Sequence, residues 1–341
     1  MKTAIILFNL GGPDGPDAVK PFLFNLFNDP AIIGLPQPLR WLVAKLISGR
    51  RAPIAAGIYE QMGGRSPILS NTEAQASALE AALGSGFKCF IAMRYWRPRS
   101  SDQVAAVKAW GPDRVLLLPL YPQYSTTTTG SSVKEWQREA ARAGLAVPTV
   151  SLCCYPANAG FADAVTARIR AGLAKFGAVR PRVLFSAHGL PKKIVDAGDP
   201  YQTQVEQSVA AVRARLALPE LDWVICYQSR VGPLEWIGPS TEAEVVRAGA
   251  DGVPLLVVPI AFVSEHSETL VELDIEYREL AHHKGVPDYV RVPTVDADRD
   301  FIAGLADEAL RALGSGRTVC SGEGGRICAA DRVGCPCGSE G

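Results

Sequence analysis

The sequence predicts an α/β fold of two similar Rossmann-like domains, each a four-stranded parallel sheet flanked by helices. Three observations lead to this prediction. Eight short apolar runs alternate with segments of helical apolar spacing, which is typical of parallel sheets with right-handed crossovers. The runs are apolar at nearly every position, so both faces of each strand are expected to be buried. A chain of 341 residues is also longer than a single hydrophobic core usually supports, which favours two domains.

The first four predicted strands and the last four form two similar groups. The first group is predicted at residues 4–10, 89–94, 115–120 and 147–153, and the second at 183–187, 223–227, 253–260 and 289–292. Apolar spacing predicts helices at 72–83, 101–110, 133–143, 161–176, 202–216 and 241–248. The predicted domains are therefore 1–155 and 156–297. Residues 298–341 are expected to form a last helix, 298–313, that packs back on the first domain, followed by a cysteine-rich tail.

Composition and patterning exclude several classes of protein. Lys plus Arg number 35, as do Asp plus Glu, so no overall positive charge favours nucleic acid. Residues 3–10 are too short an apolar run for a secretory signal, and prolines break the longest one, 253–263, which falls short of the ~20 residues that span a bilayer. We therefore expect a cytoplasmic protein. The first strand–helix turn lacks the G-x-G-x-x-G spacing of dinucleotide-binding enzymes.

The polar residues that follow the predicted strands are the candidate site, because ligands of open parallel sheets bind beyond the carboxyl ends of the strands. His188 directly follows one strand, where an imidazole can accept a proton near neutral pH, or can simply cap a carbonyl. Glu265, Glu268 and Glu272 follow another at spacing i, i+3, i+7, which predicts one helix face, either lining a cleft or exposed. His282 and His283 lie in a polar stretch and are interpreted as structural or solvated.

One isolated base, a carboxylate stripe and many aromatic residues suggest a flat, hydrophobic substrate whose reaction moves protons and a metal ion. Metal insertion into a porphyrin has these needs, since two pyrrole N–H protons leave as the metal enters. An apolar cleft can hold and bend the ring while a base and nearby carboxylates remove the protons.

Seven motifs, in order and spacing, resemble those of ferrochelatase over residues 3–310. They are Leu10-Gly11-Gly12-Pro13, Gly63-Gly64-Arg65-Ser66-Pro67, Arg94-Tyr95, Tyr121-Pro122-Gln123-Tyr124-Ser125, Ser186-Ala187-His188-Gly189-Leu190-Pro191, Gln228-Ser229-Arg230-Val231-Gly232-Pro233 with Trp236, and Ser264-Glu265-His266-Ser267-Glu268-Thr269-Leu270. Leu10 stands where some members carry Met, and Arg65 where others carry Gly.

The resemblance implies a chelatase fold and insertion of Fe²⁺ into a porphyrin, with protoporphyrin IX expected, to make haem. It implies that His188 accepts the protons and that Glu268 is the carboxylate facing the ring, so these two would meet the Fe²⁺ substrate. Glu265, His266 and Glu272 would form an acidic path for protons or metal. The implied porphyrin-binding residues are Tyr59, Ser66, Arg94, Tyr95, Tyr121 and Trp236.

Other functions stay open at this level. A coproporphyrin chelatase, or a tetrapyrrole chelatase for cobalt or nickel, would share much of the motif set. A non-catalytic porphyrin or haem carrier would need a pocket and an axial ligand, but no carboxylate stripe opposite a lone histidine. The sequence gives no indication of the oligomeric state or of the iron donor.

Residues 36–51 form an amphipathic helical pattern. One face carries Leu39, Leu42, Val43, Leu46 and Ile47, and the charges are Arg40, Lys45, Arg50 and Arg51. Apolar side chains in such a row must meet protein or lipid. The segment is either a helix packed on its own domain or a lip over the cleft in peripheral contact with the inner face of an anionic membrane.

Three of the eight cysteines crowd the end of the chain, at Cys328, Cys335 and Cys337. A cytoplasmic enzyme of this size seldom needs disulfides, so metal is favoured. Cys153 or Cys154, at the end of a predicted strand, would be the fourth ligand, and Cys320 is a weaker candidate. Some ferrochelatases hold a [2Fe–2S] cluster with one internal and three C-terminal cysteines, and the resemblance implies that arrangement here. Structural zinc and an unliganded tail are the alternatives.

Overall fold

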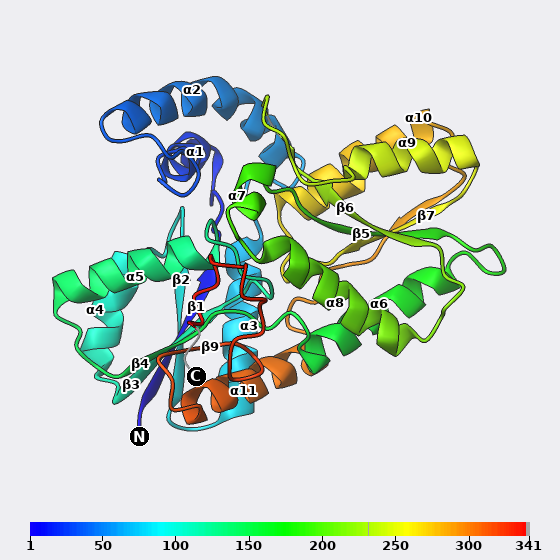
Figure 1. Cartoon of the computed structure of the whole chain (residues 1–341). Coiled ribbons are helices and arrows are strands. Elements are labelled where there is room, and N and C mark those ends of the chain that lie inside the picture. The colour runs from blue at the N-terminus through cyan, green and yellow to red at the C-terminus, as the bar shows by residue number, and fades with distance from the viewer. Residues whose placement is uncertain (231, 339–341) are drawn as a thin grey trace.

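The structure, a computed structural model, describes residues 1–230 and 232–338 and consists of two parallel sheets with helices on both faces (Figure 1). The first sheet has the order β2-β1-β3-β4-β9 and the second β6-β5-β7-β8. The strands of the first sheet are β1 (Thr3–Asn9), β2 (Phe87–Met93), β3 (Arg114–Pro119), β4 (Thr149–Leu152) and β9 (Val319–Cys320). Those of the second sheet are β5 (Arg182–His188), β6 (Trp223–Gln228), β7 (Leu255–Pro259) and β8 (Tyr289–Arg291). The predicted α/β class and all eight predicted strands are confirmed.

The prediction of four strands in the first sheet is wrong, because the C-terminal tail adds a fifth. Strand β9 pairs in parallel with β4 through Ser151 with Val319 and Leu152 with Cys320. Two residues are too few to form a recognisable apolar pattern, so this strand carries no sequence signal of its own.

The helices are α1 (Val19–Phe27), α2 (Leu39–Glu60), α3 (Ile68–Leu83), α4 (Ser100–Trp110), α5 (Thr129–Ala143), α6 (Ala159–Ala174), α7 (Lys192–Asp196), α8 (Tyr201–Leu216), α9 (Thr241–Asp251), α10 (Tyr277–His283) and α11 (Arg299–Gly314), with a 3-10 turn at Pro16–Ala18 and a π-helix, η2, at Glu268–Glu276. Most predicted helices begin and end within four residues of their predicted places, but α2 continues to residue 60 instead of ending at 51, and α1 and α7 were not predicted. Asn158, Ser240 and Asp298 cap the helices that they precede, each accepting a backbone N–H. Gly111, Gly144 and Gly252 end α4, α5 and α9 in the left-handed conformation.

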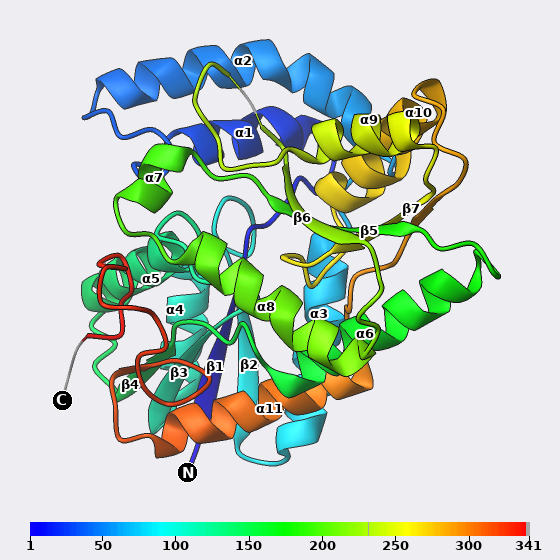
Figure 2. The same cartoon turned by 45° about the vertical axis from the view of Figure 1, so that its right-hand side comes forward.

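Alternation along each strand sends side chains to two different cores. In β1, Ala4, Ile6 and Phe8 pack with α4 and α5, whereas Ile5 and Leu7 face the opposite side. That opposite side belongs to a single large cluster that also contains α3, α6, α8 and α11 and one face of the second sheet. The two sheets are thus joined by one continuous core, and α11 crosses it, contacting α3, α6 and the first sheet (Figure 2).

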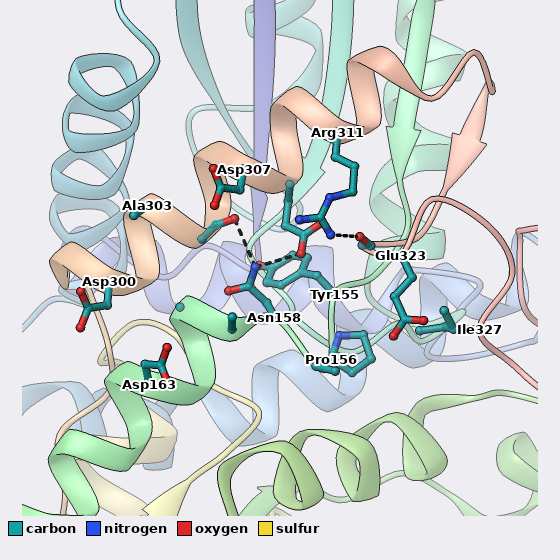
Figure 3. A pocket seen from close by; sticks show the side chains of 16 residues that line it. Tyr155, Pro156, Asn158, Asp163, Asp300, Ala303, Asp307, Arg311, Glu323 and Ile327 are labelled. Atoms are coloured by element: carbon teal, nitrogen blue, oxygen red, sulfur yellow. Dashed lines mark hydrogen bonds and ion pairs between the residues drawn. The ribbon is translucent and has the colours of Figure 1, made fainter. Parts of the chain in front are cut away.

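The tail is anchored where α6, α11 and the strand β4 meet (Figure 3). Asn158 donates to Gly304 O at 3.2 Å and to Glu308 Oε1 at 2.9 Å, and Arg311 donates to Gly322 O at 2.5 Å. A cavity of about 380 Å³ opens here, and the buried Glu308 is one of the residues that line it. Gly304 has no room for a side chain, since a Cβ would lie 2.4 Å from Asn158 Oδ1.

Candidate functional site

Two imidazoles flank one carboxylate beyond the ends of β5 and β7. His188 is the last residue of β5, and Glu268 opens η2 shortly after β7. Glu268 Oε1 lies 3.6 Å from His188 Nε2, and its Oε2 lies 3.6 Å from His266 Nε2. The structure therefore brings together His188, His266 and Glu268, with Glu268 between the two imidazoles.

Backbone carbonyls determine which nitrogen of each imidazole carries the hydrogen. His188 Nδ1 lies 2.5 Å from Gly189 O and His266 Nδ1 lies 3.0 Å from Ser264 O. Because a carbonyl only accepts, Nδ1 carries the hydrogen in both rings, and each Nε2 is left to face Glu268. His188 thus presents a basic lone pair beside a carboxylate, and its side chain is 43% exposed, so a substrate can reach it.

The charges in this trio support one another. Burial raises the pKa of Glu268, but the neighbouring His188 and His266 outweigh it and lower that pKa to about 2. Burial lowers the pKa of His266, and the hydrogen bond and charge of Glu268 outweigh it and raise that pKa. Glu268 is accordingly an anion at neutral pH and favours a proton on His266.

The acidic stripe differs from its prediction because the helix is a π-helix. Its turns are wider than those of an α-helix, so residues four apart rather than three lie along one face. The aligned carboxylates are Glu268, Glu272 and the exposed Glu276, which the sequence reasoning missed. The spacing of four between acidic residues was the available signal. Glu265 precedes the helix, so its expected place on the stripe is wrong.

Glu265 instead belongs to a buried ion-pair network. Its Oε1 accepts from Arg291 Nη1 at 2.5 Å and from Thr294 N at 2.9 Å. Arg291 also pairs with Asp274, and it is almost fully buried. Asp296 lies beside this network, and burial, with the charge of Glu265, raises the pKa of Asp296 to about 6.

Glu272 is held rigidly by the loop after β6. It accepts from Ser229 N at 2.7 Å, Ser229 Oγ at 2.5 Å, Gln228 Nε2 at 3.0 Å and Tyr277 Oη at 3.1 Å. Ser229 adopts a positive φ of 60°, which is uncommon for a residue with a side chain and typical of functional sites. The carboxylate is thus fixed one step along η2 from Glu268.

Arg94 and Tyr95 lie at the end of β2, but their polar groups are occupied. Arg94 pairs with Asp29 at 2.8 Å and with Glu135 at 3.0 Å, and Tyr95 Oη donates to Asp29 at 2.8 Å. Ser131 also donates to Asp29 at 2.6 Å. Asp29, which the sequence analysis did not single out, is therefore the centre of a buried network that positions Arg94 and Tyr95.

Of the remaining predicted ring contacts, Tyr59, Tyr121 and Trp236 lie near the trio, and Ser66 lies against Gly12. Tyr59 lies near Ser267 and Glu268, and burial, with the charge of Glu268, raises the pKa of Tyr59 to about 12. Trp236 is paired with Pro191 in the loop after His188, and its indole Nε1 is buried without a hydrogen-bond partner in the described residues. Burial raises the pKa of Tyr121, which also feels the charge of Glu268. Ser66 lies so close to Gly12 that a Cβ there would be 2.5 Å from the Ser66 Cβ.

Five cysteines gather between the end of β4 and the tail. Cys153, Cys154, Cys335 and Cys337 are buried together, with Cys328 packed against them. Cys153 Sγ lies 3.4 Å from Cys154 Sγ and 3.6 Å from Cys337 Sγ. Cys320 is instead part of the main core, and its Sγ faces Ser151 O. Within the described residues, no group of three or more His, Cys, Asp or Glu side chains is arranged to hold a metal ion.

The predicted helix at 36–51 is part of the longer α2, which packs on α1 with Ala44 and Ser48 buried, while part of its predicted apolar face is exposed. Leu39, Leu42 and Leu46 are about half exposed, at 48%, 55% and 53%, and Trp41 is 41% exposed. Trp41 is flanked by Lys45, whose ammonium lies 4.9 Å from the ring centre. Among the residues that the structure describes, no helix has the length and apolar character needed to cross a membrane.

Comparison with known proteins gives consistent results. A family model described as ferrochelatase matches residues 2–313. The chain is 55% identical to the ferrochelatase of Phenylobacterium zucineum (strain HLK1), covering 100% of this chain and 99% of the relative. It is 52% identical to the ferrochelatase of Caulobacter vibrioides (strain NA1000 / CB15N), covering 98% and 97%. Among solved structures, SirB from Bacillus subtilis with Fe³⁺ shares the fold, with a TM-score of 0.56 at 13% identity over 93% of this chain and 99% of that one.

Proposed function

The chain belongs to the ferrochelatase family and inserts Fe²⁺ into a porphyrin to make haem, and we propose that His188 and Glu268 perform this reaction on protoporphyrin IX. The observation that carries the proposal is the carboxylate of Glu268 between two imidazoles, each 3.6 Å away. Haem is the iron complex of protoporphyrin IX, whereas the iron complex of coproporphyrin would still need decarboxylation. An anaerobic assay that offers both porphyrins with Fe²⁺ tests the choice, and preferential turnover of coproporphyrin would overturn it.

In the reaction, two pyrrole N–H protons leave and Fe²⁺ binds the four ring nitrogens. His188 accepts a proton at Nε2, because its Nδ1–H is held by Gly189 O. Glu268 stabilises the imidazolium that forms, since it is ionised and lies beside that nitrogen. No electron is transferred in this step, so iron stays ferrous.

We assign the path away from the ring to His266, Glu272 and Glu276. Glu272 and Glu276 continue the face of η2 that begins with Glu268, and Glu276 reaches solvent. Carboxylates in such a row carry protons outward or receive Fe²⁺ inward. Glu265 keeps a supporting role, because Arg291 neutralises it.

The ring contacts that we propose are Tyr59, Ser66, Tyr121 and Trp236. Arg94 and Tyr95, which the sequence also suggested, act mainly by positioning, since Asp29 holds both. A non-catalytic porphyrin carrier is the alternative of another class. It would bind porphyrin with no time-dependent metallation, so turnover separates the two functions.

We further propose that Cys328, Cys335 and Cys337, with Cys153 or Cys154, hold a [2Fe–2S] cluster. Both internal candidates lie beside the three tail cysteines in one buried group, with Cys153 Sγ 3.4 Å from Cys154 Sγ and 3.6 Å from Cys337 Sγ. When bound, the cluster supplies metal–thiolate cross-links between the tail and β4.

The cluster is tested by colour and metal content after anaerobic purification. A red-brown protein that Cys335→Ser bleaches and destabilises would support it. Cys89→Ser is the matched control, because Cys89 is a free thiol in β2, away from the group. A colourless protein with one zinc per chain would contradict the proposal.

Finally, we propose that α2 rests on an anionic membrane surface. The exposed row of Leu39, Trp41, Leu42 and Leu46 is flanked by basic residues, which suits an interface between lipid headgroups and acyl chains. Flotation with vesicles containing anionic lipid should carry the protein upward at low salt, and Trp41→Ser with Leu42→Ser should abolish this. A protein that stays at the bottom at low salt would refute the contact.

A further inference from the structure

Gln204, in the first turn of α8, directs a buried amide at two sulfurs. Its side chain is buried, its Oε1 accepts from Tyr124 N at 2.7 Å, and its Nε2 donates to Cys154 Sγ at 3.3 Å and to Cys328 Sγ at 3.2 Å. Because a backbone N–H can only donate, the oxygen of the amide must face Tyr124. The NH₂ group therefore must face the sulfurs, and the orientation of the amide is fixed by its partners.

Neutral thiols are poor partners for such a donor. A thiol sulfur is a weak acceptor, and both hydrogens of this buried NH₂ group meet sulfur rather than oxygen. A hydrogen bond to a charged acceptor is roughly twice as strong as one between neutral groups. The arrangement is therefore most stable when the two sulfurs carry negative charge, as metal-bound thiolates do.

The amide also lies at a junction between the tail and the rest of the molecule. Cys154 follows β4 and Cys328 belongs to the tail, so the two donated bonds connect segments that are far apart in sequence. A backbone hydrogen bond also holds the tail to the loop just before α8, since Gly334 N donates to Gly198 O at 3.0 Å. One turn before Gln204, Tyr201 Oη donates to His188 O at 3.1 Å.

We propose that Gln204 is the hydrogen-bond donor to the cluster's thiolates and that it raises the cluster's reduction potential. The inference rests on the proposed [2Fe–2S] cluster. Reduction adds an electron to the cluster, and a donated N–H stabilises the added negative charge on sulfur. Of the two internal cysteines, Cys154 is the one that Gln204 reaches. Gln204 is thus a positioning and tuning residue that touches neither porphyrin nor Fe²⁺.

The first test is redox potentiometry of Gln204→Met, which keeps the length of the side chain and removes both donors. We expect the midpoint potential to become more negative, by about tenfold in the equilibrium constant for reduction or ~59 mV for a one-electron couple. Gln207→Met is the matched control, one turn later on α8, where the amide oxygen has no hydrogen-bond partner among the described residues. Its potential should equal that of the wild type.

A second measurement uses the wild type, so it does not depend on the folding of a variant. With ¹⁵N in the glutamine side chains, pulsed EPR of the reduced cluster should detect coupling to one ¹⁵N nucleus. A red-brown wild type without this coupling, and with an unchanged potential in Gln204→Met, would overturn the role of Gln204 and leave the cluster standing. A colourless, zinc-containing wild type would overturn both.

Discussion

Replacing Glu268 by Gln tests the electrostatic part of the site, because the two side chains have the same shape and differ in charge. The carboxylate lies 3.6 Å from His188 Nε2. At that separation an ion pair is worth about 4–5 kcal/mol at an effective dielectric constant of about 20. The pKa gives a similar value. Against the effect of burial, the two imidazoles lower the pKa of Glu268 from 4.5 to about 2, which corresponds to ~3 kcal/mol.

We expect Glu268→Gln to lower kcat for Fe²⁺ insertion by roughly 10-fold to 10²-fold, because the part of this ~3 kcal/mol that is due to His188, the rest being due to His266, stabilises the His188 imidazolium and is lost. Porphyrin binding, measured separately by fluorescence quenching, should change little. Glu279→Gln removes one charge from the exposed surface of α10 and is the control. A variant with normal kcat, or one whose loss lies wholly in porphyrin affinity, would refute the assigned role.

The same variant should alter stability at acid pH. The folded pKa of Glu268 is about 2, below its ordinary 4.5, so ionised Glu268 stabilises the native state above pH 4.5. This contribution disappears as the pH falls from about 4.5 to 2. The free energy of unfolding of the wild type should therefore fall more steeply across that window than that of Glu268→Gln. Parallel curves would mean that the carboxylate is not held as the structure indicates.

Three further predictions follow from single residues. His188→Ala should retain porphyrin binding while turnover falls by roughly 10²-fold or more, whereas His282→Ala on the surface should be nearly silent in the same assay. Asp296→Asn should raise the free energy of unfolding by about 1–2 kcal/mol at pH 7.5 and leave it unchanged at pH 3.5, as measured by urea titration. The reason is that the pKa of Asp296 is raised from 3.8 to about 6 in the native state, so the native state loses stability as the pH rises through that range. Gly12→Ala should cost about 1–3 kcal/mol, since its Cβ would lie 2.5 Å from that of Ser66, and Gly15→Ala, with open space, should not.

The sequence predicted the strands well and the acidic helix poorly, for physical reasons. Strands buried on both faces must be apolar at nearly every position, so β1 and β7 are visible as continuous runs. The geometry of η2 depends on tertiary packing, and carboxylates placed three or four residues apart are compatible with an α-helix as well as with a π-helix.

Partners distant in sequence were equally hidden. Arg291 lies 26 residues from Glu265, and Asp29 lies 66 from Tyr95. The sequence around Glu265 does not indicate its ion pair with Arg291, and the sequence around Asp29 does not indicate its hydrogen bond with the Tyr95 hydroxyl. The sequence could suggest that His188 and Glu268 lie close together, because one ends β5 and the other comes after β7 of the same sheet, and the order of elements already implies this.

The strand β9 has a consequence for how the chain folds during synthesis. The first sheet presents β4 as an open edge until Val319 and Cys320 pair with it, and α11 reaches its place against α3 only slightly earlier. The first domain to leave the ribosome is therefore the last to be completed, after the second sheet has formed. A chain that stops before residue 319 would expose an unpaired strand edge to other chains, so a truncated product should aggregate rather than persist as a weaker enzyme.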